Sequence, residues 1–430
     1  MMFFEDRHGY QLGTDSPEAA AAYSDGLDRF LALTGDAEAP LSEAVTHDPA
    51  FAHGWSTLAA LHHFNGDRER TSAALVAARS HVPGCTEREA GYLKVLEVAV
   101  EARVADTLSL AEAHLERFPR DVLAIEQVML SSHFGGGGAD DRARALAIFH
   151  DRASSMDGDW AYQGVSAFVH QEADLLDEAM RLAERSLRAR PANADAMHSV
   201  AHVHFERGAH ATGRTELADW VTAHGIGGPF HVHFSWHLAL HDVGLGEWAR
   251  ALDRYRSIIT PTVSGPGTIA DAPTLLWRLM LRGVDPALLP WHELVAVAGP
   301  MAATPSFRYG DWHVAFALAG GGDESRLADL EAALVEHSGG RPQAPAMVRV
   351  VRGLRAYTAG DYAGAGDLLD MPAESVPYLG GSRAQREVIE DTLVDALIRM
   401  DRRERAGEIL EDRLSRRPSA HDEELLARCG

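Results

Sequence analysis

Apolar residues recur with helical spacing along most of the chain from about Ser16 onward, which predicts an all-helical protein. Runs of β-branched residues are short and do not alternate with polar ones, so strands are not expected. Prolines recur at intervals of 34, 36, 72 and 38 residues, at Pro49, Pro83, Pro119, Pro191 and Pro229. These intervals are close to one or two multiples of the ~34 residues of a tetratricopeptide helix-turn-helix unit.

Similar turn sequences separate the helices expected within each unit. Gly66-Asp67, Gly246-Glu247 and Gly360-Asp361 each place a residue that ends a helix before an acidic residue that begins the next. A single unit of this kind cannot bury its apolar face, so neighbouring units must stack. The prediction is an α-solenoid of tetratricopeptide-like helix-turn-helix repeats.

The repeats are expected to form one array over residues 1–430. N-terminal repeats are expected at about 16–190, central histidine-rich repeats at about 191–260, and C-terminal repeats at about 270–430. Segments rich in glycine or proline interrupt the pattern and are expected to be turns or links: Gly135–Gly138, Thr260–Pro273, Ser338–Pro345 and Met371–Ser382.

Charge and cysteine content narrow the range of functions. The formal net charge is −23, and no basic face stands out, so a nucleic-acid partner is not expected. Two cysteines cannot build a disulfide framework, which favours the cytoplasm. The N-terminus does not have the form of a signal peptide, and no apolar run is long enough for a membrane span.

Histidine is the unusual residue, with 23 copies. Two pairs, His198-Ser-Val-Ala-His202 and His233-Phe-Ser-Trp-His237, each have the spacing that puts both rings on one helical face. The second pair follows the first by 35 residues, about one repeat. We expect helices over 194–206 and 229–242 and expect the four rings to line one cavity. His8, His114 and His150 are among those expected at the surface or at helix ends.

Three interpretations of the four histidines remain open. They could bind a divalent metal such as zinc and activate water at an open position. Without metal, neutral imidazoles could hold a polar ligand or act as bases. Packing residues that recur from one repeat to the next, without any function, would also produce a 35-residue spacing between the pairs. The HExxH motif is absent, as are a phosphate-binding P-loop, a dinucleotide fingerprint and a GxSxG elbow.

Downstream segments add further candidates. Asp271 precedes an apolar helix that carries Trp277 and Arg278, and Asp311-Trp312-His313 begins another helical run. A glycine turn then leads through Ser382, a predicted N-cap, into a helix with Gln385 and Arg386. The free N–H groups of that helix start, together with Arg386, could bind a carboxylate or phosphate. Structural roles are the alternative for each of these residues.

Several of these segments resemble the tetratricopeptide repeat protein 38 family, and its bacterial members in particular. The matches are Gly13-Thr-Asp-Ser-Pro-Glu-Ala19, Asp48-Pro-Ala-Phe51, Glu87-Arg-Glu89, Phe118-Pro-Arg-Asp121, His198–His202, His233–Leu240, Leu275–Leu279, Asp311–His313 and Gly380–Arg386. The resemblance implies an all-helical repeat fold and implies that His198, His202, His233, His237 and His313 share a site. It implies no settled activity. The chain departs from the family pattern at Arg383, where histidine is usual, and at Glu387, where aspartate is usual.

Three functions fit these residues. The first is a binding protein whose concave, His/Trp/Arg-lined cleft takes a small polar molecule or a peptide segment, with no cofactor. Its expected ligand-binding residues are His198, His202, His233, His237, Trp277, Arg278, His313, Gln385 and Arg386. The second is an enzyme of small-molecule metabolism, with His198, His202, His233, His237, His313, Asp271 and Asp311 as candidate catalytic residues. In its metal-assisted form His198, His202, His233 and His237 would bind the ion. The third is a protein-protein scaffold.

Overall fold

The computed structural model describes residues 4–263 and 269–430, and these residues fold as helices connected by short turns. Among them, the only β pairing is an isolated bridge between Glu5 and Gln11. No described helix is both long enough and apolar enough to cross a bilayer. The all-α, tetratricopeptide-like architecture predicted from the sequence is confirmed. The predicted Ser264-Gly265-Pro266-Gly267 loop lies outside the described residues.

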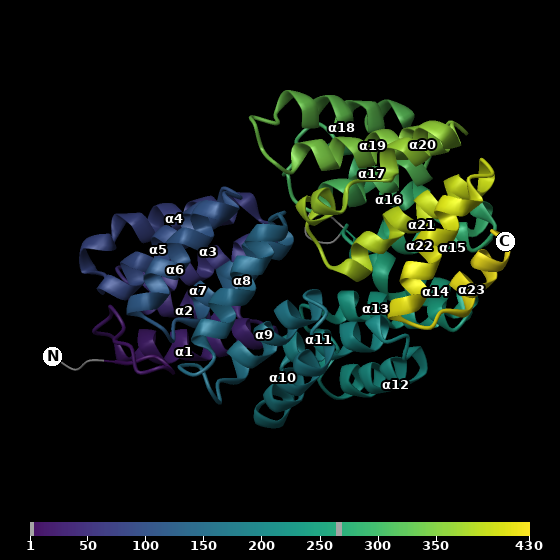
Figure 1. Ribbon diagram of the computed structural model, residues 1–430. Helices are drawn as coiled ribbons and strands as arrows, with labels where there is room; N and C mark the ends of the chain where they lie inside the picture. The colour runs from purple at the N-terminus through teal and green to yellow at the C-terminus, as the bar shows by residue number, and fades with distance from the viewer. Residues whose placement is uncertain (1–3, 264–268) are drawn as a thin grey trace. The chain divides into compact units, whose positions relative to one another are not determined.

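Contacts between residues group the chain into two compact units (Figure 1). Unit 1 comprises residues 1–135, 140–199 and 222–231, and unit 2 comprises 136–139, 200–221 and 232–430. Each unit has its own cluster of buried apolar side chains. The arrangement of all repeats as one array over residues 1–430 stays a prediction.

Unit 1 is a succession of helix pairs. Its helices are α1 (Pro17–Ala32), α2 (Glu38–His47), α3 (Ala52–Phe64), α4 (Arg68–Ser80), α5 (Glu87–Val100), α6 (Val104–Arg117), α7 (Val122–Met129), α8 (Ala139–Arg152), α9 (Trp160–Glu172) and α10 (Leu176–Ala189). Helix α1 packs on α2, α3 on α4, α5 on α6 and α9 on α10, and contacts such as α3 with α5 join one pair to the next. Helix α7 continues into a π-helical turn at Leu130–Phe134.

Helix α11 (Ala194–Glu206) begins among the residues of unit 1 and ends among those of unit 2. The remaining helices are α12 (His210–Trp220), α13 (His231–Gly244), α14 (Trp248–Arg254), α15 (Ala272–Leu281), α16 (Trp291–Ala298), α17 (Gly310–Gly320), α18 (Glu324–Glu336), α19 (Ala344–Thr358), α20 (Tyr362–Leu369), α21 (Arg383–Arg399), α22 (Arg403–Arg416) and α23 (Ala420–Ala427). Short 3-10 helices include Ala373–Leu379, directly before α21.

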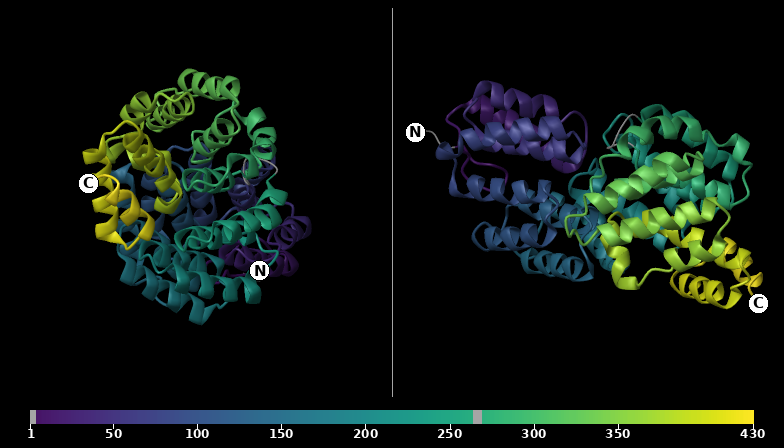
Figure 2. Two further views of the ribbon diagram at one scale, coloured as in Figure 1. Left: turned by 90° about the vertical axis from the view of Figure 1, so that its right-hand side faces the viewer. Right: turned by 90° about the horizontal axis from the view of Figure 1, so that it is seen from above.

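Within unit 2, helix α15 packs against α17 and also against α21, more than a hundred residues later (Figure 2). Trp277 is fully buried at this contact, and its indole N–H donates to the Thr392 hydroxyl at 2.9 Å. The second half of α15 is therefore held against the middle of α21.

The turns have the chemistry predicted from the sequence. Gly66 and Gly360 have φ of 76° and 80°, a left-handed conformation that glycine adopts without steric cost. The following aspartates cap the next helices: the Asp67 carboxylate accepts from the Arg70 N–H and Asp361 from the Gly364 N–H. The predicted helix 194–206 matches α11, and the one predicted at 229–242 begins and ends two residues later, at His231 and Gly244.

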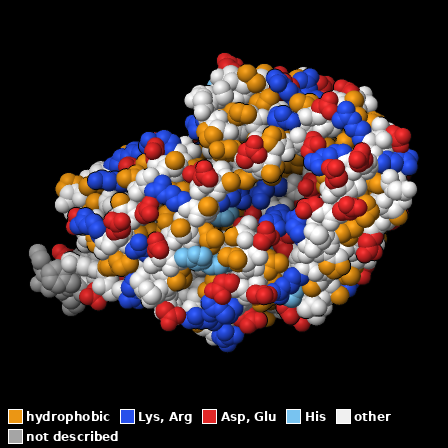
Figure 3. All heavy atoms as spheres, in the orientation of Figure 1, with side chains coloured by type: hydrophobic (Ala, Val, Ile, Leu, Met, Phe, Trp, Pro, Cys, Tyr) orange, Lys and Arg blue, Asp and Glu red, His pale blue; other side chains and the backbone are white. Residues whose placement is uncertain are grey.

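Charged side chains of both signs are mixed over the face of the molecule shown in Figure 3. Some charges are buried instead. In unit 1, Arg88 lies 3.2 Å from the Asp121 carboxylate and 3.4 Å from that of Asp6, and all three side chains are almost completely buried. His114 is buried as well, and its Nε2 lies 3.0 Å from Asp121. His114 lies in the last turn of α6, as expected for a helix end, and its ring is buried there as the second partner of this carboxylate. The same expectation is wrong for His8, which is buried outside any helix with its Nε2 2.8 Å from the Asp159 carboxylate.

We predict that Asp121→Ala destabilises unit 1 by about 3 kcal/mol, because it removes one of the two carboxylates that neutralise buried Arg88. Burial would raise the pKa of Asp121, but Arg88 and His114 outweigh it and hold the pKa well below its usual value. The stabilisation is therefore complete above the unfolded pKa of about 4 and is lost as pH falls through the lower folded pKa. Urea unfolding from pH 7 to pH 2 measures it. Asp121→Asn, which retains the helix cap, should abolish this pH dependence, and an unchanged profile would contradict the assignment.

Candidate functional site: a histidine cluster with an orienting carboxylate

Three of the four paired histidines meet in unit 2. His202 comes from α11, and His233 and His237 lie one turn apart on α13. The ring centroid of His237 is 4.5 Å from that of His202 and 4.6 Å from that of His233. Nε2 of His237 is 3.1 Å from Nε2 of His233. His202 and His237 are buried, while the His233 side chain is 20% exposed to solvent.

The spacing of these rings is compatible with a single metal ion. One ligand nitrogen from each of His202, His233 and His237 lies within 4.8 Å of the others. Bonds of about 2.0–2.1 Å in a tetrahedral zinc site separate neighbouring nitrogens by roughly 3.3 Å, so the observed spacing needs only small side-chain movements. The prediction that histidines 35 residues apart emerge together is thus confirmed for His202 and His237.

His198 belongs to unit 1 and lies one turn before His202 on the same helix. In unit 1 the His198 ring stacks on Phe168, with centroids 5.5 Å apart, and its edge contacts Phe230. Aromatic packing therefore fixes the orientation of this ring.

Asp271 connects the histidine cluster to two further segments of unit 2. One carboxylate oxygen lies 2.6 Å from Nδ1 of His233, and the other accepts a hydrogen bond of 2.6 Å from the Gln385 amide. The backbone N–H of Asp271 donates to Nδ1 of His313 at 3.2 Å. Because Asp271 accepts the Nδ1 proton of His233, the lone pair of neutral His233 is on Nε2, the nitrogen that faces His237.

The backbone of Asp271 is held in an unusual conformation. Its φ is 76° and its ψ is −45°, and the Ala272 N–H donates to the Ala270 carbonyl oxygen across it, which is the strained geometry of a γ-turn. Gln385 is fixed in turn, because its side chain and Ser382 form a capping box at the start of α21. The Arg278 guanidinium donates to the carbonyl oxygens of Ala384 and Gln385. The buried side chains of Ser382 and Arg278 thus hold Gln385 in the position from which it donates to Asp271.

Burial and hydrogen bonding set the charge states of this group. Burial would raise the pKa of Asp271, but His233, His313 and Gln385 outweigh it and lower the pKa. Burial lowers the pKa of His313 to about 3, so this ring is neutral at neutral pH. Its Nδ1 accepts from Asp271, so its proton is on Nε2. That nitrogen is buried and has no hydrogen-bond partner among the described residues.

Other predicted site residues make contacts within the helix packing. Asp311 accepts from the backbone N–H groups of Ser306 and Phe307, and burial raises the pKa of its carboxyl. Arg386 donates to the carbonyl oxygens of Gly380 and Gly381. Trp277 and Arg278 are buried against α21. A role in ligand binding stays a prediction for Trp277, Arg278 and Arg386, and a catalytic role stays a prediction for Asp311.

Two contributions were not anticipated from the sequence. Trp236 is fully buried and stacks on His233, with ring centroids 5.4 Å apart. Arg383, the position where the family pattern has histidine, lies 3.7 Å from the carboxylate of Glu206. Glu206 is one turn beyond His202 on α11, so the substituted position lies close to the helix that carries the cluster. Helical spacing places Glu206 in line with His202, but no local signal identifies Arg383 as its partner.

A comparison with models of known protein families finds no match. Among solved structures, the chain is similar to human IFIT1 in a dimer with m7Gppp-AAAA, at 12% identity and a TM-score of 0.40, over 99% of this chain and 97% of that one. It is also similar to the P58(IPK) TPR domain, at 10% identity and a TM-score of 0.22, over 92% and 98% of the two chains. A third similarity, to Naa15/Naa10 bound to HypK-THB, has 14% identity and a TM-score of 0.27, over 91% and 62%. At these TM-scores the similarities carry no argument about function.

We predict that Asp271→Ala destabilises unit 2 by about 1–3 kcal/mol, because it leaves the Gln385 amide and the His233 Nδ1–H without their acceptor. Alanine also tolerates the positive φ poorly. Asp271→Asn, which retains one acceptor oxygen, should lose less than half as much. Chemical unfolding of both variants tests this. Equal losses, or none, would show that the carboxylate does not hold the three segments together.

Proposed function

We propose that the protein is a tetratricopeptide-like repeat protein that binds a divalent metal ion of the zinc type through His202, His233 and His237. The metal would retain a coordination position for a small polar ligand or water. The observation that carries this proposal is the contact between Asp271 and His233. It fixes one imidazole with its Nε2 lone pair directed at a second imidazole 3.1 Å away.

Metal-binding histidines generally donate their other ring N–H to a carboxylate or a carbonyl oxygen, which orients the ring and raises its basicity. The Asp271 carboxylate does this for His233 and is itself held by Gln385. Neutral imidazole is a preferred ligand of zinc, copper and nickel. Three protein ligands with one open position are typical of catalytic rather than structural zinc sites.

The convergence of the sequence motifs also supports membership of the tetratricopeptide repeat protein 38 family, which we propose for this chain. His233, Asp271, His313 and Gln385 come from four separate segments, three of which carry quoted motifs of the resemblance. A purely structural explanation would have to account for each motif separately. A shared site accounts for them together.

A second candidate function requires no metal. If His237 carries its proton on Nε2, it donates to Nε2 of His233, and the result is a chain of hydrogen bonds that ends at Asp271. Such a chain could bind a polar molecule or transfer a proton. Proteins of this repeat type also present surfaces to other proteins, which remains the third candidate.

Metal content of the full chain distinguishes these functions. After metal removal and titration with Zn²⁺ at pH 7.5, His233→Gln and His237→Gln should each bind one equivalent less than the wild type, because glutamine cannot replace an imidazole ligand. His231→Gln, at the start of the same helix, is the matched control and should bind as much as the wild type. Undiminished binding by both His233→Gln and His237→Gln would exclude the metal and leave the hydrogen-bonded chain.

His198→Gln tests whether the coordination position is open. A loss of affinity as large as that of His237→Gln would make His198 a fourth ligand and the site closed. Unchanged binding would leave that position available for water or a polar ligand. Thermal unfolding with and without Zn²⁺ confirms that each variant folds, and a bound ion should stabilise the wild type by about 2.7 kcal/mol at a hundred times its Kd.

A further inference from the structure

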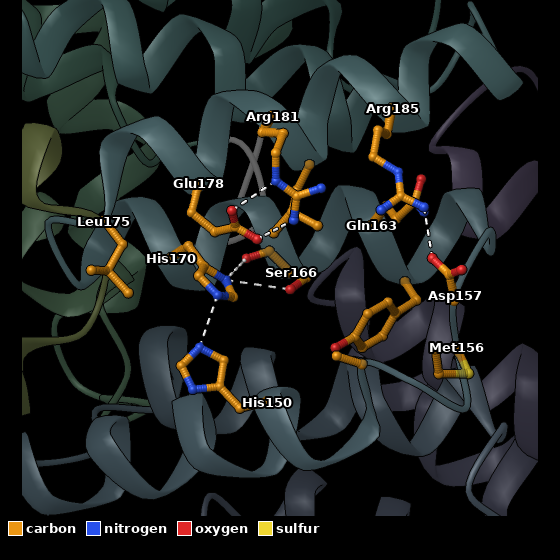
Figure 4. A pocket seen from close by; sticks show the side chains of 13 residues that line it. His150, Met156, Asp157, Gln163, Ser166, His170, Leu175, Glu178, Arg181 and Arg185 are labelled. Atoms are coloured by element: carbon orange, nitrogen blue, oxygen red, sulfur yellow. Dashed lines mark hydrogen bonds and ion pairs between the residues drawn. The ribbon is translucent and has the colours of Figure 1, made fainter.

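A second pair of histidines lines a cavity inside unit 1, in a region where the sequence shows no motif. The cavity of about 440 Å³ lies between the end of α8, the turn that follows it, and helices α9 and α10 (Figure 4). Its polar lining includes His150, Gln163, His170, Glu178, Arg181 and Arg185. Met156, Leu175 and Leu182 form much of the apolar wall.

The two imidazoles face each other in the arrangement seen for His233 and His237. Nε2 of His170 lies 3.0 Å from Nε2 of His150. His170 is 4% exposed, and its Nδ1 lies 2.7 Å from the Ser166 carbonyl oxygen, which can only accept. The proton of neutral His170 is therefore on Nδ1, and its Nε2 presents a lone pair to His150.

His150 can either donate a hydrogen bond to that lone pair or bind an ion together with it. It is exposed at the end of α8, so water can solvate whichever of its nitrogens carries the proton. In the absence of an ion, a proton on Nε2 completes a hydrogen bond to His170. When the proton moves to Nδ1, two lone pairs converge at a separation close to the roughly 3.3 Å of neighbouring ligands in a tetrahedral site.

Glu178 lines the same cavity as the pair, but its carboxylate does not lie within 4.8 Å of both imidazoles, so its side chain would have to move to share an ion with them. It projects from α10 toward the same side of the cavity as His170 and is held by Arg181 (Figure 4). A bound cation would attract this carboxylate, and Arg181 is exposed enough to remain in water without it. The Gln163 amide, 4% exposed, forms no hydrogen bond with the described residues, so the cavity holds a polar group available to a molecule bound beside the ion.

We propose that His150 and His170 form a second metal site, which binds a divalent ion of the zinc, nickel or copper class with Glu178 as third ligand. The remaining coordination positions open into the cavity, where water or a small ligand occupies them. Imidazole nitrogens favour this class of metal, and anchoring of His170 by a backbone carbonyl is the support that such ligands generally have. The site is separate from the histidine cluster of unit 2 and does not depend on it.

The test is a titration of the metal-free full chain with Zn²⁺ and, separately, with Ni²⁺, at pH 7.5 against a chromophoric chelator. His150→Gln and His170→Gln should each weaken one binding step at least tenfold, and Glu178→Gln should weaken it by a smaller factor. His47→Gln is the matched control. His47 is also an exposed histidine near a carboxylate, Glu43 at 3.4 Å, but it has no second imidazole, so the variant should bind as the wild type does.

His150 is exposed, so His150→Gln should fold as the wild type does. The test therefore remains valid even if His170→Gln fails to fold. Combination with His233→Gln separates the two sites: the double variant should lose both binding steps, and each single variant only one. If His150→Gln and Glu178→Gln bind both metals as the wild type does, the proposal is wrong whatever happens at the unit 2 cluster. A tenfold loss in His47→Gln equal to that in His150→Gln would also overturn it, as general surface binding.

Discussion

A carboxylate that is only 7% exposed is costly to bury as an anion unless donors replace the water it loses. Asp271 has such donors on both oxygens, from His233 and Gln385, at 2.6 Å each. These partners come from α13 and α21, so the anion is stable only when both helices are in place. Its backbone N–H adds His313 from α17. The positive φ at Asp271 is tolerated because these contacts fix the residue on several sides.

Helix packing within unit 2 brings these segments together. Helix α15 contacts both α17 and α21, so residue 271, just before α15, reaches side chains from both neighbours. Trp277 and Arg278 strengthen the α15–α21 contact through Thr392 and the carbonyl oxygens of Ala384 and Gln385. Arg278 therefore fixes the position of Gln385. Through Gln385 it also fixes the positions of Asp271 and His233.

Helical periodicity was sufficient to predict the repeat architecture and the helix from Ala194 to Glu206, because both depend on local spacing. The same spacing predicted that His202 and His237 meet, since equivalent positions of adjacent repeats lie side by side. It did not predict that Asp271 bonds to His233 and Gln385, because these contacts depend on how several helices curve within unit 2. The pairing of His150 with His170 has neither the four-residue nor the 35-residue separation, so only the fold reveals it. The buried contact of His114 was missed for a similar reason, since its partner Asp121 comes from the start of another helix, α7.

Contact between two imidazoles is not by itself a sign of a metal site, and a third pair shows the difference. In unit 2, Nδ1 of His210 lies 3.2 Å from Nδ1 of His241. Burial lowers the pKa of His210 to about 4 and that of His241 to about 3, so both rings are neutral at neutral pH. Nε2 of His241 is buried without a hydrogen-bond partner among the described residues, so no acceptor orients that ring.

The position of His241 is set by close packing instead. A Cβ added at Gly213 would lie 2.7 Å from the His241 ring, and one added at Gly244 would lie 2.4 Å from His210. The third pair therefore fills a space between helices that only glycine leaves open. The other two pairs have an oxygen acceptor behind one ring, which directs its lone pair at the second ring. That acceptor, and not the closeness of the rings, distinguishes a pair prepared to bind a cation from one that packs.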